Sequence, residues 1–151
     1  MVSFASVDGV LDFANEREEE AFGFYTDLAA KVGRPDMQTL FRQFAEEEKG
    51  HKAKLQAVKQ GGKLRPAEKE VLDLKMSDYL VAETGTAEMS YQKALVLAMK
   101  KEKASFRLYT DLAAGAPSDD LKNTFLHLAQ EEARHKLRFE VEYDNEVMRE
   151  N

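Results

Sequence analysis

The stretch Glu47-Glu48-Lys49-Gly50-His51 decides the fold of this chain. Its Glu-x-x-His motif places Glu48 and His51 three residues apart, and residues at this spacing lie on the same face of a helix. The two side chains can therefore bind one ion together. The same motif occurs again 84 positions later, at Glu132 and His135, so the chain carries two such pairs.

One further Glu precedes each copy at a matching distance, Glu18 and Glu102. The six groups interrupt stripes of apolar residues spaced alternately three and four apart, and such stripes are typical of the buried faces of bundled helices. A charged group buried in a bundle needs a partner, so each Glu on a buried face requires an explanation. Four neighbouring acidic residues fall off the stripes, and we expect them on the surface: Glu19, Glu20, Glu46 and Glu47.

The stripes predict four long helices, over about 7–32, 36–60, 86–114 and 119–148. Short turns make the first two and the last two helices antiparallel hairpins, over about 7–61 and 86–148. Residues 62–85 are predicted to form a long crossover that runs along the bundle between the second and third helices. The predicted fold is an all-α four-helix bundle, as a single domain over residues 1–151.

An internal repeat supports this architecture. Shifted by 84 positions, residues 18–30 match residues 102–114, with Tyr-Thr-Asp-Leu-Ala-Ala in both copies. Residues 36–51 match residues 120–135 under the same shift. A helical hairpin used twice gives a bundle with near two-fold symmetry, whereas two copies of this length are too few for a solenoid.

The composition restricts the class of protein further. A chain of 151 residues, 43% hydrophobic and 33% charged, suits one helical domain. Its net charge of -6 argues against nucleic acid as a partner. The absence of Cys excludes disulfides, iron–sulfur clusters and Cys-ligated zinc. Since we find no signal-peptide pattern and no apolar run that could span a bilayer, we expect a cytoplasmic protein without membrane contact.

The buried acidic groups predict a metal site whose ligands are Glu18, Glu48, His51, Glu102, Glu132 and His135. Four ionised carboxylates carry about -4, which two divalent cations balance; without metal, some of them would have to take up protons. Basic residues nearby in sequence fall off the stripes, and we expect them to face water: Lys49, Lys52, Lys101, Lys103, Arg134 and Lys136. An oxygen-rich ligand set suits iron or manganese better than structural zinc.

Three further residues have open roles. Tyr25 and Tyr109 each lie two turns after an upstream Glu of the site. Each phenol is predicted either to donate a hydrogen bond to a carboxylate ligand or simply to pack in the core. His127 is predicted not to be a ligand, because the matching position in the first repeat is Gln43. The competing interpretation of the whole pattern is a buried polar network without metal.

These residues resemble the rubrerythrin branch of the ferritin-like superfamily over nearly the whole chain. The matching motifs are Glu18-x-x-Ala21-x-x-x-Tyr25, Glu48-x-x-His51, Glu102 and Glu132-x-x-His135. The resemblance implies a ferritin-like four-helix bundle and a carboxylate-bridged centre of two iron ions, with manganese or zinc as substitutes. It also implies a reaction with hydrogen peroxide or dioxygen, an external electron donor such as a rubredoxin-like protein, and a homodimer.

The chain departs from the rubrerythrin pattern in two places. It has no Cys for the rubredoxin-like domain that supplies electrons in full rubrerythrins. It also lacks a further Glu one turn after Glu102, where Ser105 stands, with Ala21 as the counterpart in the first repeat. Apolar residues outside the buried stripes are candidates for the contact in a homodimer: Phe22, Phe24, Phe106 and Leu108.

The sequence leaves three functions open. The first is a di-iron oxidoreductase that reduces peroxide. The second is an iron-handling or ferroxidase protein, in which iron enters, is oxidised and leaves. The third is a non-catalytic helical module in which the site is vestigial or in which metal only stabilises the fold.

Overall fold

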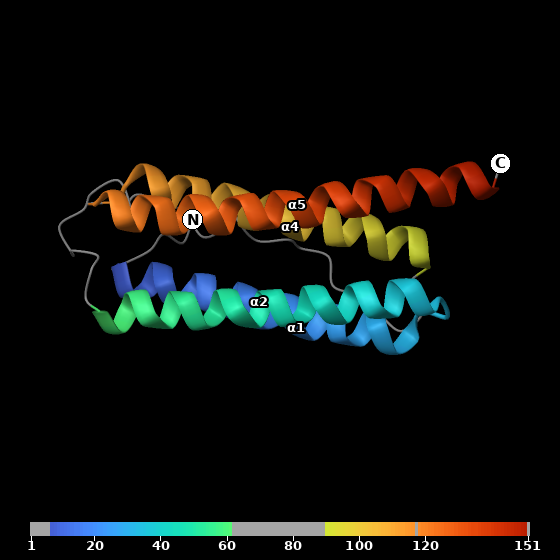
Figure 1. The fold of residues 1–151 in the computed structure, drawn as a ribbon, viewed down its shortest axis with the longest axis horizontal. Helices are drawn as coiled ribbons and strands as arrows, with labels where there is room; N and C mark the ends of the chain where they lie inside the picture. Colours follow the sequence, from blue (N-terminus) through green and yellow to red (C-terminus); the bar gives the residue numbers. More distant parts are fainter. Residues whose placement is uncertain (1–6, 62–89, 117, 151) are drawn as a thin grey trace.

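A computed structural model describes residues 7–61, 90–116 and 118–150 of the chain. Within these residues lie four helices, α1 (Val7–Lys31), α2 (Pro35–Gly61), α4 (Tyr91–Ala114) and α5 (Asp119–Glu150). Figure 1 shows α1 and α2 as one antiparallel hairpin and α4 and α5 as a second, with the two hairpins side by side. The predicted all-α four-helix bundle is confirmed.

Local sequence signals set most helix ends. α1 and α2 lie close to the predicted ranges of 7–32 and 36–60. Ser118 precedes α5, and its Oγ accepts a hydrogen bond from the Leu121 N–H at 3.2 Å. Such an N-cap pairs one of the N–H groups that the first turn of a helix leaves without a partner.

The predicted start of the third helix at Thr86 is wrong for α4. Ser90 has an extended backbone, with φ -66° and ψ 159°, and its Oγ accepts a hydrogen bond from the Lys93 N–H at 3.2 Å. This N-cap starts the helix at Tyr91, because the extended residue cannot continue a helix from upstream. The predicted crossover falls within residues 62–89, which lie outside the described residues.

Two apolar clusters fill the bundle, one toward each end. The first joins the beginning of α1 to the end of α2 and includes Leu11, Leu55, Leu112 and Phe125. The second joins the end of α1 to the beginning of α2 and includes Tyr25, Phe41, Leu95 and Phe139. In every helix, the predicted ligands lie between the residues of the two clusters. Apolar side chains therefore close the site at both ends of the bundle.

The predicted contact surface for a homodimer needs one correction. Leu108 is fully buried in the first apolar cluster, so the expectation that it lies outside the core is wrong. The apolar face of this helix is wider than a narrow stripe, as is usual in globular bundles. Phe22 and Phe24 are partly buried against the second cluster, and Phe106 is exposed. None of the helices in the described parts of the chain is long and apolar enough to cross a membrane.

Arg34, in the turn between α1 and α2, ties the two hairpins together. Its guanidinium pairs with Glu142 at 3.1 Å and with Glu146, both on α5. It also lies over the ring of Tyr91 on α4, 5.5 Å from the ring centroid. Glu142 is buried, and a buried carboxylate needs such a partner. The contact holds the hairpins at one end of the bundle, beyond the second apolar cluster.

Candidate metal centre

The structure brings all six predicted ligands together inside the bundle. Their exposed fractions lie between 0% and 2%: Glu18, Glu48, His51, Glu102, Glu132 and His135. α1 and α4 each contribute one Glu, while α2 and α5 each contribute a Glu and a His. The Glu and the His on one helix share a face because three residues separate them.

The six residues form two overlapping groups of four. These groups are Glu18, Glu48, His51 and Glu132, and Glu48, Glu102, Glu132 and His135. Within each group, one ligand atom from each residue lies within 4.8 Å of the others. Glu48 and Glu132 belong to both groups, so their carboxylates are placed to bridge two cations. Each group also has a Glu and a His of its own, and the whole cluster therefore suits two metal ions.

Each imidazole ring directs one nitrogen at this cluster. Nδ1 of His51 lies 2.8 Å from a Glu132 oxygen and 3.5 Å from a Glu18 oxygen. Nδ1 of His135 lies 3.1 Å from a Glu48 oxygen. Two ligand atoms bound to one cation at about 2.1 Å and at right angles are about 3.0 Å apart. The observed separations therefore suit ligands that share an ion.

The cluster contains buried polar atoms that have no hydrogen-bond partner among the described residues. They are Glu18 Oε2, Glu102 Oε2, both carboxylate oxygens of Glu48 and of Glu132, and Nδ1 of His51 and of His135. Buried polar atoms are nearly always paired, and leaving one unpaired costs about 1–3 kcal/mol. Carboxylate oxygens and imidazole nitrogens are ligands for divalent transition metals. The residues present therefore fit two bound cations.

Crowding of the acidic groups shifts their pKa values. Burial raises the pKa of Glu48 well above its usual range, and the charge of Glu132 raises it further. Burial and neighbouring carboxylates also raise the pKa of Glu132. Burial lowers the pKa of His51, but the nearby carboxylate of Glu18 outweighs burial and raises this pKa to about 9. The metal-free cluster therefore holds protons, and cations must displace them in order to bind.

Tyr25 and Tyr109 form hydrogen bonds across the bundle. The Tyr25 hydroxyl donates to Oε1 of Glu102, and the Tyr109 hydroxyl donates to Oε1 of Glu18. Burial, and then the charge of these carboxylates, raises the pKa of both tyrosines, so both phenols stay protonated. Each bond holds one carboxylate oxygen and leaves Oε2 for the cluster. Of the two predicted roles, the structure thus shows the hydrogen bond to a clustered carboxylate.

Two further carboxylates lie at the outer nitrogens of the histidines. The Nε2–H of His51 donates to Oε2 of Glu131 at 2.5 Å, and Nε2 of His135 lies 3.4 Å from Oε2 of Glu47. The expectation that Glu47 is a surface residue is wrong, because only 24% of its side chain is exposed. Glu131 was missed, although both copies of the motif share the pattern Glu-Glu-x-x-His. Such carboxylates fix the tautomer and the orientation of a ligating histidine.

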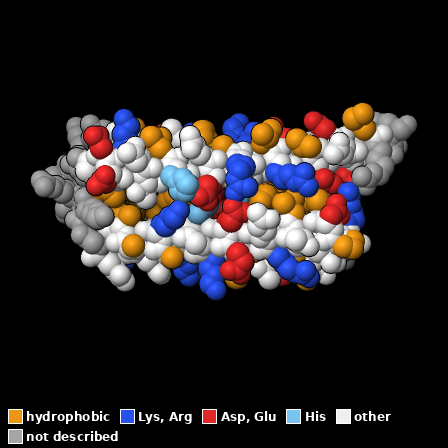
Figure 2. All heavy atoms as spheres, viewed as in Figure 1, with side chains coloured by type: hydrophobic (Ala, Val, Ile, Leu, Met, Phe, Trp, Pro, Cys, Tyr) orange, Lys and Arg blue, Asp and Glu red, His pale blue; other side chains and the backbone are white. Residues whose placement is uncertain are grey.

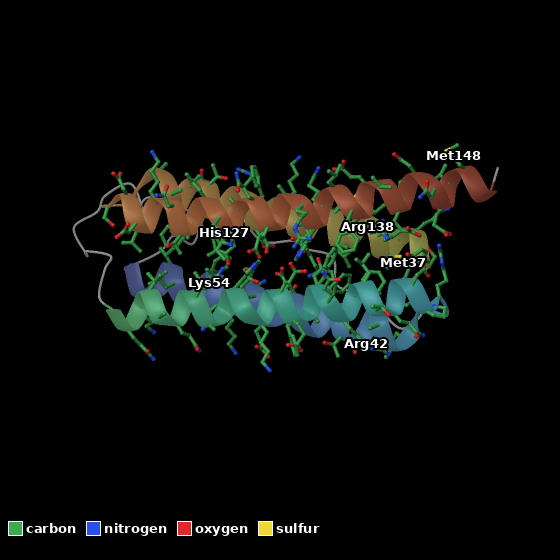
Figure 3. The ribbon with its side chains drawn as sticks, viewed as in Figure 1. Met37, Arg42, Lys54, His127, Arg138 and Met148 are labelled. Carbon is green, nitrogen blue, oxygen red and sulfur yellow. The ribbon has the colours of Figure 1, made fainter. Side chains whose placement is uncertain are left out.

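His127 extends this arrangement to the surface. Its Nε2 lies 2.6 Å from Oε1 of Glu131, and 55% of its side chain is exposed. Lys54 of α2 lies 4.0 Å from the same oxygen. Figure 3 shows His127 and Lys54 on opposite hairpins, and Figure 2 shows histidine, acidic and basic side chains gathered where the hairpins meet. His127 belongs to neither group of four in the described part of the chain, consistent with its prediction as a non-ligand.

Four long helices around overlapping groups of buried Glu and His are typical of proteins with carboxylate-bridged metal pairs. The family model for Rubrerythrin matches residues 9–143, and the chain therefore belongs to the Rubrerythrin family. A solved structure of a hypothetical protein from Pyrococcus furiosus is similar, with a TM-score of 0.68, 23% sequence identity and 95% of each chain covered. At this identity the likeness shows the fold alone. A comparison with curated proteins found no match.

Proposed function

We propose that the chain is a di-iron oxidoreductase that reduces hydrogen peroxide with electrons from an external donor. The observation that carries the proposal is the pair of overlapping groups of four, in which buried ligand atoms face one another. Membership of the Rubrerythrin family supports iron as the metal, since members typically bind a di-iron centre. An oxygen-rich ligand set is also the kind that suits iron or manganese.

In this proposal the six clustered residues hold two ions. Glu18 and His51 would hold one ion, and their counterparts in the second repeat, Glu102 and His135, would hold the other. Glu48 and Glu132 belong to both groups and would be shared between the two ions. Bound iron would supply electrons and Lewis acidity.

The rest of the chain controls geometry and solvent. Reduction of one peroxide molecule breaks its O–O bond, consumes two electrons and two protons, and yields two water molecules. Tyr25 and Tyr109 hold the orientation of two carboxylates throughout, since both phenols stay protonated. Glu131 keeps the proton on Nε2 of His51, so that Nδ1 faces the cluster as a neutral ligand. The two apolar clusters exclude bulk water from both ends of the site.

The electrons must come from outside this sequence. With no Cys, the chain has no rubredoxin-like iron site of its own. A separate rubredoxin-like protein is the donor that we propose. Electron transfer from this donor would be tested by adding the reduced donor protein to the oxidised site under anaerobic conditions.

Stopped-flow oxidation of the reduced, iron-loaded protein tests the proposed function. We expect faster oxidation by hydrogen peroxide than by dioxygen, and the loss of both reactions in Glu48→Gln and Glu132→Gln. The exposed residue Glu19 provides the control Glu19→Gln, which should react like the unchanged protein. Equal or negligible rates with both oxidants would reject the proposal.

Two further measurements separate the alternative functions. Repeated oxidation of added Fe(II) without any reductant would indicate an iron-handling protein instead. Failure to retain any metal after reconstitution would leave only the helical module. In that case, added metal would not protect the protein against unfolding, and Glu48→Ala and Glu132→Ala would not change this.

A further inference from the structure

A pocket between α1 and α4 reaches one edge of the carboxylate cluster. Its volume is about 20 Å³, and its lining includes Arg17, Glu20 and Ala21 of α1 and Lys101, Glu102 and Ser105 of α4. Glu102 is buried and is one of the six clustered groups. A space of this size holds about one or two water-sized molecules. The pocket therefore suits a molecule of very few atoms that comes from solvent to the cluster.

Both repeats line this pocket with equivalent residues. Under the shift of 84 positions, Arg17 corresponds to Lys101, and Ala21 corresponds to Ser105. Matching positions in two repeats meet at the axis that relates them, so the pocket lies on the near two-fold axis of the bundle. The same shift exchanges the two groups of four. A molecule in the pocket therefore approaches the cluster from the side of α1 and α4, next to Glu102.

The outer part of the pocket carries an excess of positive charge. Arg17 pairs with Glu20 at 2.7 Å, and Lys101 pairs with the same carboxylate. The counterpart of Glu20 is Ala104, an uncharged residue that also lines the pocket. Lys101 is only 10% exposed, so the expectation that it faces water is wrong. A positive opening attracts anions, does not oppose neutral molecules and repels divalent cations.

The pocket also offers a hydrogen-bonding atom that is not in use. Nε of Arg17 is buried and has no hydrogen-bond partner within the described ranges of the chain. The guanidinium is held in place over the ring of Phe13, 5.1 Å from its centroid. Hydrogen peroxide suits this N–H donor, because each of its two oxygens can accept a hydrogen bond.

We propose that this pocket admits and binds the small oxidant, a neutral or singly charged anionic molecule of two or three non-hydrogen atoms, and does not admit divalent cations. Arg17 binds the molecule, Lys101 adds positive charge, and the small side chains of Ala21 and Ser105 leave the space open. The inference rests on the proposed function, in which the oxidant is hydrogen peroxide. The pocket can nevertheless be tested without turnover.

Azide is the probe, because it is a three-atom anion whose binding to the oxidised, iron-loaded protein is followed by absorption. Ser105→Leu fills the pocket and should weaken azide binding at least about tenfold. Arg17→Gln removes a charged donor and should weaken binding about tenfold. Glu20→Gln raises the positive charge and should strengthen binding about twofold. Ala30→Leu adds the same bulk at an exposed position of α1 and should have no effect.

Cobalt(II) binding to the metal-free protein is the second readout. The affinity and the association rate of cobalt should stay within about twofold in Glu20→Gln, because cations do not enter through this opening. Slower cobalt association in Glu20→Gln would overturn the exclusion of cations, because it would show that cobalt enters through the pocket. If Ser105→Leu disturbs cobalt binding, the two charge variants test the proposal instead. The affinity for azide should then fall in Arg17→Gln and rise in Glu20→Gln. An unchanged azide affinity in both variants would overturn the proposal.

The outcomes for the pocket and for the proposed function are distinguishable. If azide binding depends on these residues but peroxide does not oxidise the reduced protein, the pocket stands and the peroxide function fails. If peroxide oxidises the reduced protein at the same rate in all pocket variants, and azide binding is also unchanged, the function stands and the pocket proposal fails.

Discussion

Without metal, the stability of the fold should fall as the pH rises. The pKa of His51 is raised from 6.5 to about 9, because the nearby carboxylate of Glu18 outweighs the opposite effect of burial. Since one pKa unit corresponds to about 1.4 kcal/mol, the charged imidazole stabilises the metal-free fold by about 3 kcal/mol. A pKa that is raised by folding gives full stabilisation below pH 6.5, and this stabilisation is lost as the pH rises through 9.

The carboxylates around His51 do not reverse this trend. Burial and neighbouring charges raise the pKa values of Glu48 and Glu132, so their contribution to stability also falls with increasing pH. Burial alone would raise the pKa values of Glu102 and Glu131. The interactions of Glu102 with His135 and of Glu131 with His51 outweigh burial and lower both pKa values. The stabilisation from these two groups is lost only as the pH falls below their ordinary value of 4.5. Glu102 and Glu131 therefore do not change the free energy of unfolding with pH above pH 6.5.

Urea unfolding of the chelator-treated protein, followed by far-UV circular dichroism, measures the effect. Between pH 6.5 and 9, the free energy of unfolding should fall by about 3 kcal/mol. With saturating cobalt(II) the slope should reverse, because binding displaces protons and strengthens as the pH rises. His51→Gln should reduce the slope of the metal-free protein, and the exposed control His127→Gln should retain it. A metal-free stability that is constant or rising over this range would refute the reasoning.

Three further variants test the surroundings of the site. Tyr25→Phe should lower the free energy of unfolding in urea by about 1.5–3 kcal/mol, since a buried carboxylate loses its donor; identical urea curves would contradict this. By calorimetry, Glu131→Gln should weaken cobalt(II) binding about 10- to 100-fold. Glu47→Gln should weaken it less, because the Glu47 carboxylate is farther from His135 than the Glu131 carboxylate is from His51. The reverse order would count against a role of these carboxylates in orienting the histidines. Phe41→Ala should cost about 3–5 kcal/mol in urea through the cavity it leaves, whereas a similar loss in exposed Phe106→Ala would show that burial is not the cause.

The clustered residues could be located from the sequence because the rule that places them is local. A spacing of three puts Glu48 and His51 on one helix face however the helices pack, and the internal repeat supplies the second pair. The buried stripes then need only to face a common interior for the groups to meet. The start of α4 was harder to predict, because Ser90 becomes a cap only where the backbone turns extended.

Contacts between helices could not be predicted in the same way. Tyr25 donates to Glu102 of α4, and not to the Glu two turns earlier on its own helix, because the partner depends on how the helices lie together. Glu47 and Lys101 are exposed on an isolated helix but are largely covered in the bundle. Periodicity predicts exposure least well for residues at the margin of a buried stripe. In this chain such residues include Glu47 and Lys101, which lie beside the site.

The two repeats agree where they face the cluster and differ where they face solvent. Two like cations need equivalent ligands, and both copies supply the same Glu, His and Tyr side chains. Access from solvent needs no such symmetry, since one opening is enough. On the side of α1 and α4, Glu20 has Ala104 as its counterpart, and this difference gives the opening its positive charge. On the side of α2 and α5, His127 has Gln43 as its counterpart, so a histidine reaches the surface from only one repeat. The repeats therefore offer equivalent ligands to two ions, while the two faces of the site carry different charged groups.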